Sequence, residues 1–296
     1  MPLLPEHLES SLLLPGNADT AYRDPAVYYH NGQLYLYFTL VESRNGSDPL
    51  EYVAMTTTAD LVHFTPVLKL TPGDPAYNYS SPGNILEFNG SYHLCCQTYC
   101  RENGEKFGNE RSRIFVMHSG DLIHWSEPEL LRVKGPDVPE EEMGRMIDAY
   151  LLREEDTGLI WCFYKQNGCS FSTSKDLITW TPQGNISCGE NVSVQSDRPG
   201  HYLLWHSPAN GIGCMESSDL KHWKACGELI TLGQKNWPWA SGRLTAGTVL
   251  DLRDQPGGFG WLFFHGSGGT GEEQYFDNYA GIGVAWSRDL RNWEWK

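Results

Sequence analysis

The feature that most constrains this chain is a short motif that occurs five times. Each copy has a serine or threonine, then Asp-Leu, two further residues and an aromatic residue, as in "HSGDLIHW" and "WSRDLRNW". The aspartates of the five copies lie 43 to 70 residues apart. Internal repetition on this scale is typical of folds in which one supersecondary unit is repeated side by side. The repeated aspartates are Asp60, Asp121, Asp176, Asp219 and Asp289.

Each copy is preceded by a predicted pair of strands. In the first unit the alternating run "PAVYYHNGQLYLYFT" has an Asn-Gly turn at its centre, which is a strong hairpin signal. Four units continue with a third short strand such as "GIGVAWS", and long helical periodicity is absent. Five units of three to four antiparallel strands predict an all-β, five-bladed β-propeller with its active site at one mouth of the central channel. We expect one domain over residues 1–296, with blades at about 21–70, 71–135, 141–186, 187–233 and 234–296.

The repeated aspartates are predicted to be structural. A short acidic side chain after Ser or Thr can accept hydrogen bonds from its own backbone and so stabilise a turn. A group that is needed in every blade also differs from a catalytic group, which an active site needs once. The informative carboxylates should therefore be those that some blades have and others lack.

Three blades have a carboxylate at the start of the first strand. These are Asp24 in "RDPAVYY", Asp148 in "MIDAYLL" and Glu190 in "GENVSVQ". The first strand of each propeller blade lines the channel, so the three side chains should meet at one mouth. Clustered like charges raise one another's pKa and cost stability, so their presence suggests a function. Two carboxyl groups in different protonation states are the usual catalytic groups of glycoside hydrolases.

The strands "RDPAVYYHNGQLYLYFT", "IDAYLLREEDTGLIWCFYK" and "GENVSVQSDRPGHYLLWHS" resemble the active-site strands of glycoside hydrolase family 43 and related propeller families. The resemblance covers nearly the whole chain. It implies inverting hydrolysis of arabinofuranosides, xylosides or galactosides, with Asp24 as general base and Glu190 as general acid. Asp148 would then orient the acid and tune its pKa. A non-catalytic carbohydrate-binding propeller and a glycan phosphorylase remain as alternatives, and the latter needs a basic phosphate pocket, for which Arg243 and Arg145 are the candidates.

Other polar and aromatic residues near the predicted mouth are candidates for substrate binding. Arg23 is expected to hold Asp24 ionised. Arg243 is interpreted either as a clamp for a sugar hydroxyl or carboxylate, or as part of a structural ion pair. The full set of candidate substrate-binding residues is Arg23, Asn78, Tyr79, Ser81, Trp237, Trp239 and Arg243.

Two tryptophans and two histidines have competing interpretations. Trp237 and Trp239, in "NWPWASG", could stack on a sugar ring or pack between blades. His206 and His265 end strands in two blades, where a lone histidine is more often a satisfied core residue than a catalyst.

The composition of the chain limits the classes of molecule that it is expected to bind. The formal charge of −15 offers no basic footprint for nucleic acid and would be repelled by anionic membranes, so a carbohydrate is the expected partner. Residues 1–20 lack the segments of a signal peptide, and we expect a cytoplasmic location. The eight cysteines do not have the spacing of a zinc site. We expect no metal site and no cofactor, although calcium or another structural ion in the channel is an open alternative; oligomeric state is not predicted.

Overall fold

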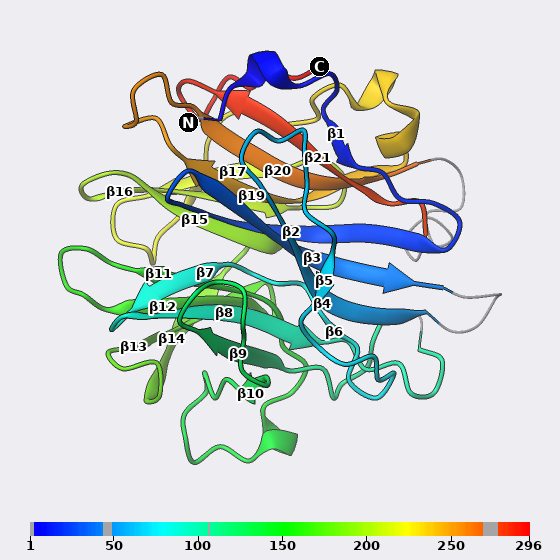
Figure 1. Cartoon of the computed structure of the whole chain (residues 1–296). Coiled ribbons are helices and arrows are strands. Elements are labelled where there is room, and N and C mark those ends of the chain that lie inside the picture. The colour runs from blue at the N-terminus through cyan, green and yellow to red at the C-terminus, as the bar shows by residue number, and fades with distance from the viewer. Residues whose placement is uncertain (1–2, 44–48, 106, 269–277) are drawn as a thin grey trace.

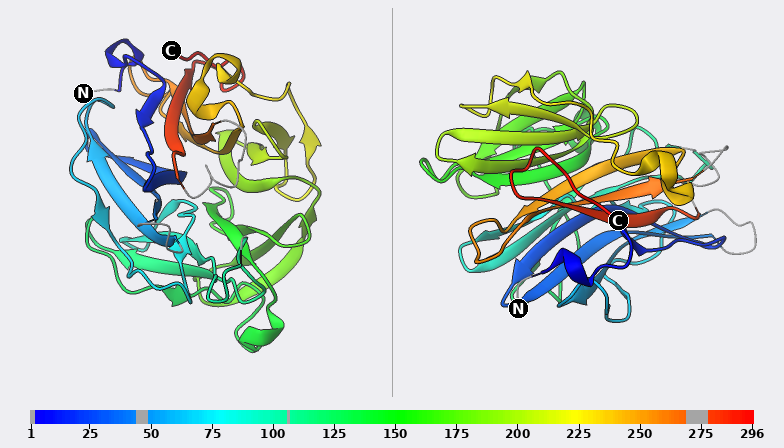
Figure 2. Two further views of the ribbon diagram at one scale, coloured as in Figure 1. Left: turned by 90° about the vertical axis from the view of Figure 1, so that its right-hand side faces the viewer. Right: turned by 90° about the horizontal axis from the view of Figure 1, so that it is seen from above.

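The computed structural model describes residues 3–43, 49–105, 107–268 and 278–296. Its strands form five antiparallel sheets, which are arranged as blades around a central channel (Figure 1; Figure 2, left). The predicted all-β, five-bladed propeller is therefore confirmed. Within the described ranges, no helix has the length and apolar character needed to cross a membrane.

Every blade has the same order of strands from the channel outward, and the first strand of blade 2 is split in two. The split falls at Pro82, which has no backbone N–H to donate to a neighbouring strand. The strands are β2 (Thr20–His30), β3 (Gln33–Glu42), β4 (Leu50–Thr58) and β5 (Leu68–Lys69) in blade 1; β6 (Tyr79–Ser80) with β7 (Ile85–Phe88), β8 (Ser91–Thr98), β9 (Ile114–Ser119) and β10 (Glu129–Leu130) in blade 2; β11 (Ile147–Arg153), β12 (Ile160–Lys165), β13 (Cys169–Ser174) and β14 (Trp180–Ile186) in blade 3; β15 (Glu190–Arg198), β16 (His201–Ser207), β17 (Gly213–Ser217) and β18 (Lys224–Ala225) in blade 4; and β19 (Arg243–Asp251), β20 (Gly260–Ser267) and β21 (Gly281–Ser287) in blade 5.

The N-terminal segment closes the ring. Strand β1 (Leu12–Leu14) pairs with β21 and becomes the outermost strand of blade 5, with Leu12 opposite Gly283. The backbone N–H of Ser11 also donates to the carbonyl of Lys296, so the two ends of the chain lie side by side (Figure 1). Residues before β2 thus complete the last blade, which was not predicted from the sequence. The described ranges also contain four 3-10 turns: η1 (Pro5–His7), η2 (Glu140–Glu142), η3 (Gln234–Asn236) and η4 (Pro238–Ala240).

The hydrophobic core is divided among the contacts between blades. One cluster of buried side chains joins blades 1 and 2 and includes Tyr37 and Leu94, and another joins blades 3 and 4 and includes Phe163 and Leu204. Blades 2 and 3, 4 and 5, and 5 and 1 are joined by clusters of the same kind. Because apolar burial is the main driving force for folding, each blade depends on both of its neighbours.

The Asp-Leu turns are structural, as predicted. In the first copy, Asp60 Oδ1 accepts hydrogen bonds from the backbone N–H groups of Val62 and His63, both at 2.8 Å, and the Thr58 hydroxyl accepts from Leu61 N–H at 2.9 Å. The leucine that follows each aspartate has a positive φ of 59 to 68°. These hydrogen bonds lower the pKa of the Asp60 carboxyl, so the turn is stabilised by an ionised side chain.

Candidate active site

An irregularity at the start of the inner strand shapes each blade at the channel mouth: a β-bulge in four blades and the break between β6 and β7 in blade 2. In blade 1 the register of β2 against β3 shifts between Arg23 and Ala26, and similar shifts occur in blades 3, 4 and 5. In every blade one non-glycine residue there takes a left-handed conformation, with φ between 39 and 54°, which L-residues adopt only at a cost. These five equivalent residues are Asp24, Ser81, Asp148, Asn191 and Ala246.

The equivalence of these positions corrects the sequence alignment of blade 4. The residue that matches Asp24 and Asp148 is Asn191, and Glu190 lies one position earlier, where blade 1 has Arg23. The side chains of Asp24, Asp148 and Asn191 line the narrow channel, whereas Glu190 does not. Glu190 instead lines two cavities outside the channel.

Hydrogen bonds between blades hold four of the five left-handed residues. The acceptor always lies on the second strand of the preceding blade. Within that preceding blade, it is paired with the residue just before the blade's own left-handed residue, as Thr39 is paired with Arg23. Such bonds satisfy a backbone N–H that a bulge leaves out of the strand ladder. Ser81 N–H donates to Thr39 Oγ1 at 2.7 Å, and Asp148 N–H donates to Gln97 Oε1 at 2.6 Å. Ala246 N–H donates to Ser207 Oγ at 2.8 Å, and Asp24 N–H donates to His265 Nδ1 at 3.1 Å.

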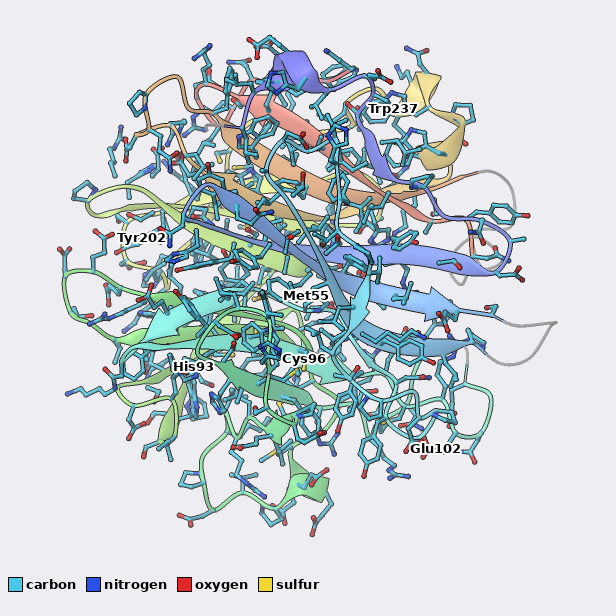
Figure 3. The ribbon with its side chains drawn as sticks, viewed as in Figure 1. Met55, His93, Cys96, Glu102, Tyr202 and Trp237 are labelled. Carbon is cyan, nitrogen blue, oxygen red and sulfur yellow. The ribbon has the colours of Figure 1, made fainter. Side chains whose placement is uncertain are left out.

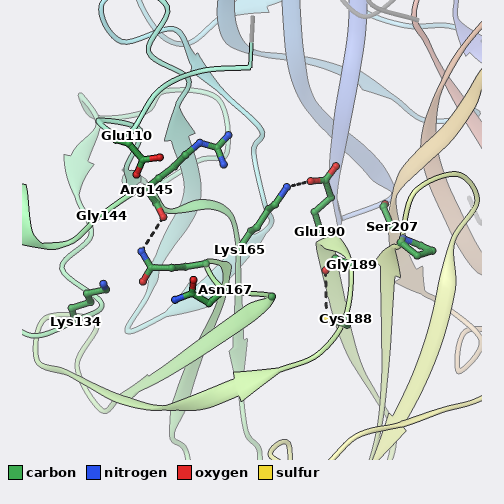
Figure 4. A pocket seen from close by; sticks show the side chains of 13 residues that line it. Glu110, Lys134, Gly144, Arg145, Lys165, Asn167, Cys188, Gly189, Glu190 and Ser207 are labelled. Carbon is green, nitrogen blue, oxygen red and sulfur yellow. Dashed lines mark hydrogen bonds and ion pairs between the residues drawn. The ribbon is translucent and has the colours of Figure 1, made fainter. Parts of the chain in front are cut away.

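Blade 3 breaks this pattern with a cation. The residue of β12 at the position of these acceptors is Lys165, opposite Ile147, and a lysine cannot accept a hydrogen bond. Its Nζ forms an ion pair with Glu190 Oε2 of the next blade (Figure 4). Arg243 of blade 5 binds the other carboxylate oxygen, with Nη2 at 2.8 Å from Oε1. Glu190 is therefore held between two cations.

Asp24 is held ionised. Burial alone would raise its pKa, but Arg23, His265 and the hydroxyls of Thr39 and Ser81 outweigh burial and lower it. The Thr39 hydroxyl donates to Asp24 Oδ2 at 2.8 Å, and Arg23 Nε lies 3.9 Å from the same oxygen. The expectation that Arg23 supports the charge of Asp24 agrees with this arrangement.

His265 contributes as a neutral ring. Because its Nδ1 accepts from the Asp24 backbone, the proton of the neutral imidazole lies on Nε2. Burial lowers the pKa of His265 to about 4. The sequence analysis treated this histidine as a core residue; it is buried, but it also lines the cavity beside Asp24.

Asp148 and Glu190 differ in protonation. Burial and the charge of Glu190 raise the pKa of Asp148 to about 7. Burial would also raise the pKa of Glu190, but Lys165 and Arg243 outweigh it, so the net shift is downward. In the free protein at neutral pH, Asp148 therefore retains a proton to a substantial extent while Glu190 is ionised.

All three carboxylates line one cavity of about 470 Å³, which we call the central cavity. Arg23, Ser81 and Arg243, three of the candidate substrate-binding residues, also line it. Behind it, Arg23 and Arg101 approach the buried carboxylate of Glu51, at 3.6 and 3.5 Å from Oε1. The further lining residues are Gln97, Tyr99, Phe107, Gly108, Glu110, Arg145, Ile147, Lys165, Asn191, Thr245 and His265.

Four other candidates lie outside the lining of this cavity. Asn78 is buried, and its Oδ1 accepts from the backbone N–H of Glu51 at 3.0 Å. Tyr79 is stacked on Tyr77 and belongs to the core between blades 1 and 2. Trp237 and Trp239 stack on each other, with ring centroids 5.3 Å apart, and pack against the core between blades 4 and 5. Figure 3 shows Trp237 beside the short helical turns of blade 5.

A structural ion in the channel is the open alternative to the expectation of no metal site. The five left-handed residues line a space of about 30 Å³ in the channel. Nowhere in the described ranges do three or more His, Cys, Asp or Glu side chains gather as a metal-binding group. Asp24 is held by Arg23 and Thr39, and the raised pKa of Asp148, about 7, favours its neutral form, so these two carboxyl groups do not fit a divalent cation.

The residues that sequence reasoning missed lie mainly on the second strands. Thr39, Gln97 and Lys165 take part in the site only because the next blade reaches them, as the hydrogen bonds above show. An alignment of the second strands would have revealed one signal. Four blades have Thr, Gln, Ser or His at this position, and blade 3 has a lysine.

Comparison of the sequence with protein-family models and with curated proteins finds no match. The fold, however, is shared with solved structures. The catalytic domain of a GH62 α-L-arabinofuranosidase from Coprinopsis cinerea superimposes with a TM-score of 0.67 at 13% identity, over 90% of each chain. A GH43 β-xylosidase/α-arabinofuranosidase from a compost microbial metagenome, in complex with xylotriose and calcium-free, gives 0.65 at 13% identity over 97% of each chain. An exo-1,5-α-L-arabinanase from a bovine ruminal metagenomic library gives 0.61 at 16% identity, over 91% of this chain and 94% of that chain.

The resemblance stated from the sequence is thus confirmed at the level of the fold. At identities of 13 to 16%, these matches show a shared fold and nothing more specific. Because one fold can carry many functions, the activity of this chain has to be argued from its own residues.

Proposed function

We propose that this chain is a glycoside hydrolase in which Asp24 is the general base and Glu190 the general acid. The observation that carries the proposal is the contrast between carboxyl groups in one cavity: Asp24 is held ionised, while the pKa of Asp148 is raised to about 7. General acid–base catalysis at neutral pH needs such a divergence. A propeller that only bound sugar hydroxyls would not need it.

In the proposed reaction, Asp24 removes a proton from water as the water attacks the anomeric carbon. The Thr39 hydroxyl donates to Oδ2, so Oδ1, at 3.4 Å from His265 Nδ1, is the oxygen we assign to the attacking water. Because water attacks the anomeric carbon directly on the face opposite the leaving group, the product should have inverted configuration.

The proton for the leaving oxygen comes from the Asp148–Glu190 pair. The two carboxyl groups interact, so they titrate as a unit. Asp148 is only 7% exposed, whereas Glu190 lines both cavities and has a side chain that is 24% exposed. We assign delivery of the proton to Glu190, once substrate has displaced Lys165 from it, and assign to Asp148 the role of holding the proton beforehand.

The proposed substrates are arabinofuranosides, xylosides or galactosides. The central cavity, about 470 Å³, is within the size range of small-ligand sites. The test is hydrolysis of a panel of aryl glycosides of these three sugars, with the anomer of the first-formed product read by NMR. Asp24→Asn is purified in parallel to detect any contaminating glycosidase.

Release of sugar by the wild type alone, with inversion, is the expected result. Release with retention would overturn the inverting mechanism. If no sugar is released and the wild type and Asp24→Asn bind the same glycans equally well, the chain is a carbohydrate-binding propeller instead.

A further inference from the structure

A second and larger cavity, about 650 Å³, adjoins the central cavity beside Glu190; we call it the side cavity. The two cavities share Glu110, Arg145, Lys165 and Glu190 as lining residues. Figure 4 shows Lys134, Arg145 and Lys165 around this space, with Lys165 directed to Glu190. The side cavity does not touch Asp24 or His265.

The position of the side cavity indicates which part of a substrate it would receive. If Glu190 protonates the leaving oxygen, the leaving group lies on the side of Glu190 that is away from Asp24. The side cavity is on that side, because Glu190 lines it and Asp24 does not. This step rests on the proposed function.

The charge of the side cavity is opposite to that of the chain. The chain has 37 acidic and 22 basic residues, yet this cavity is lined by three cations and two carboxylates. Lys165 is paired with Glu190. Within the part of the chain that the structure describes, Lys134 and Arg145 form no ion pair with a carboxylate. Partial burial and, to a smaller extent, the charge of Arg113 lower the pKa of Lys134. A lowered pKa is expected for a lysine that has no negatively charged partner.

The Arg145 guanidinium is held in place before any ligand binds. Its Nη2 donates to the Phe107 carbonyl at 3.1 Å, and the group lies 5.8 Å from the centre of the Tyr99 ring. The amide of Gln166 donates to the carbonyls of Met143 and Arg145 at 3.0 and 2.9 Å, which fixes the backbone of this segment. A guanidinium has five N–H donors, so several stay available for an anion.

We propose that the side cavity binds a carboxylate carried by the leaving-group part of the substrate, so that the enzyme acts on glycans with a uronic acid next to the scissile bond. Arg145, which lines both cavities, is the residue that would bind the carboxylate, and Lys134 adds positive charge elsewhere in the same cavity. In the free protein, where Glu190 is ionised, the lining residues carry a single excess positive charge, which a monoanion matches. A phosphate dianion would leave a negative excess beside Glu110 and Glu190, so we favour the carboxylate over free phosphate.

The test measures binding alone, so that its outcome does not depend on hydrolysis. Methyl β-D-glucuronide and methyl β-D-glucoside, which differ in the carboxylate, are titrated into the wild-type protein by NMR. The expected result is saturable binding of the glucuronide and at least tenfold weaker binding of the glucoside, with the difference reduced at high salt. Arg145→Met should weaken glucuronide binding about tenfold, because it removes the charged partner of the carboxylate. Lys134→Met should weaken it about threefold, because it lowers the positive charge of the cavity without removing a direct contact.

Two further variants provide matched controls. Lys175→Met removes an exposed lysine elsewhere on blade 3 and should leave glucuronide binding unchanged. Glu110→Gln removes a negative charge from the side cavity and should strengthen glucuronide binding severalfold, which tests the proposal even if Arg145→Met does not fold.

Equal binding of the two glycosides, or equal effects of Lys134→Met and Lys175→Met, would overturn the proposal. So would tight binding of inorganic phosphate together with release of a glycosyl phosphate, because the anion would then be a free reactant. Glucuronide binding by a protein that hydrolyses nothing would uphold the anion site and refute the proposed function alone.

Discussion

The Asp-Leu turns and the inner-strand bulges both place a non-glycine residue at positive φ in all five blades, but they use it differently. In the turns this residue is always leucine, such as Leu61 or Leu122. At the equivalent inner-strand position the residue is Asp in two blades and Ser, Asn or Ala in the other three. The turn needs an apolar side chain for packing in each blade. The bulge residue is held through its backbone N–H, which donates to the preceding blade, and does not depend on its side chain for this. The side chain of the bulge is thus free to carry chemistry.

The two regions also offset the cost of the left-handed conformation differently; this cost is about 1–2 kcal/mol per residue. The turn leucines are mostly buried, for example Leu61 at 2% exposed, so local packing compensates. At the bulges the compensation comes from the preceding blade, through acceptors such as Thr39 and Gln97. A mutation at a turn should therefore act on stability, and one at a bulge should act on activity.

The largest effect is expected for Asp24→Asn. The amide keeps the size of the side chain but cannot take a proton from water, so kcat should fall about 10²- to 10⁴-fold while the fold is kept. Asp60→Asn, in a turn, is the matched control and should keep its activity. Activity is measured on the glycoside that the wild type cleaves fastest. An equal loss of activity in both variants would contradict the distinction between the turns and the bulges.

The next largest effect is expected for Glu190→Gln, and it should depend on the leaving group. A poor leaving group needs protonation, so its hydrolysis should slow by about 10²-fold or more, while a dinitrophenyl glycoside should be affected far less. Rates across a series of aryl glycosides give the dependence on leaving-group pKa. An unchanged dependence would mean that Glu190 is not the acid.

Asp148→Asn should change how stability depends on pH. The pKa of Asp148 is about 7 in the folded protein against an ordinary value of 3.8, so the folded state binds this proton more tightly than the unfolded state. Asp148 should therefore contribute a loss of stability of roughly 2–4 kcal/mol as pH rises from about 4 to 7, and this contribution should be absent from the variant. Urea unfolding at pH 4.5 and pH 8 measures this; parallel curves for the two proteins would contradict it.

Lys165→Gln tests the role of the lysine that replaces a hydrogen-bond acceptor on the second strand of blade 3. The cation favours ionised Glu190, so its removal should raise the apparent pKa of the Asp148–Glu190 pair by roughly one unit. The alkaline limb of the activity profile, where the acid loses its proton, should move to higher pH by that amount. Lys175→Met serves as the control. A limb that stays in place would show that Lys165 has only a structural role.

The smallest effect is expected for Asp60→Ala. The variant loses two hydrogen bonds from backbone N–H groups to a side chain at the surface, which should lower the free energy of unfolding by about 1 kcal/mol. Activity at 25 °C should be unchanged. A loss of activity without a loss of stability would contradict the structural role of the turns.

Most of the fold and part of the site were predictable because they depend on local patterns. The hairpins, the Asp-Leu turns and the five units follow from residue types at short spacing, and Asp24 and Asp148 stand out because other blades lack them. Trp237 was ambiguous because an aromatic residue near a predicted mouth has the same local signal whether it binds sugar or packs in a core. The alignment of Glu190 was one position off because bulges change the register without leaving a sequence signal.

The sequence by itself determined that five similar β units would form a ring and that three of them would bring a carboxylate to its centre. Only the tertiary structure decided which charges surround each carboxylate. Lys165 and Arg243 come from two different blades, on either side of Glu190 along the chain, and His265 lies 241 residues from Asp24. Protonation depends on burial and on charges within a few ångströms, so it is decided by which blades become neighbours when the ring closes.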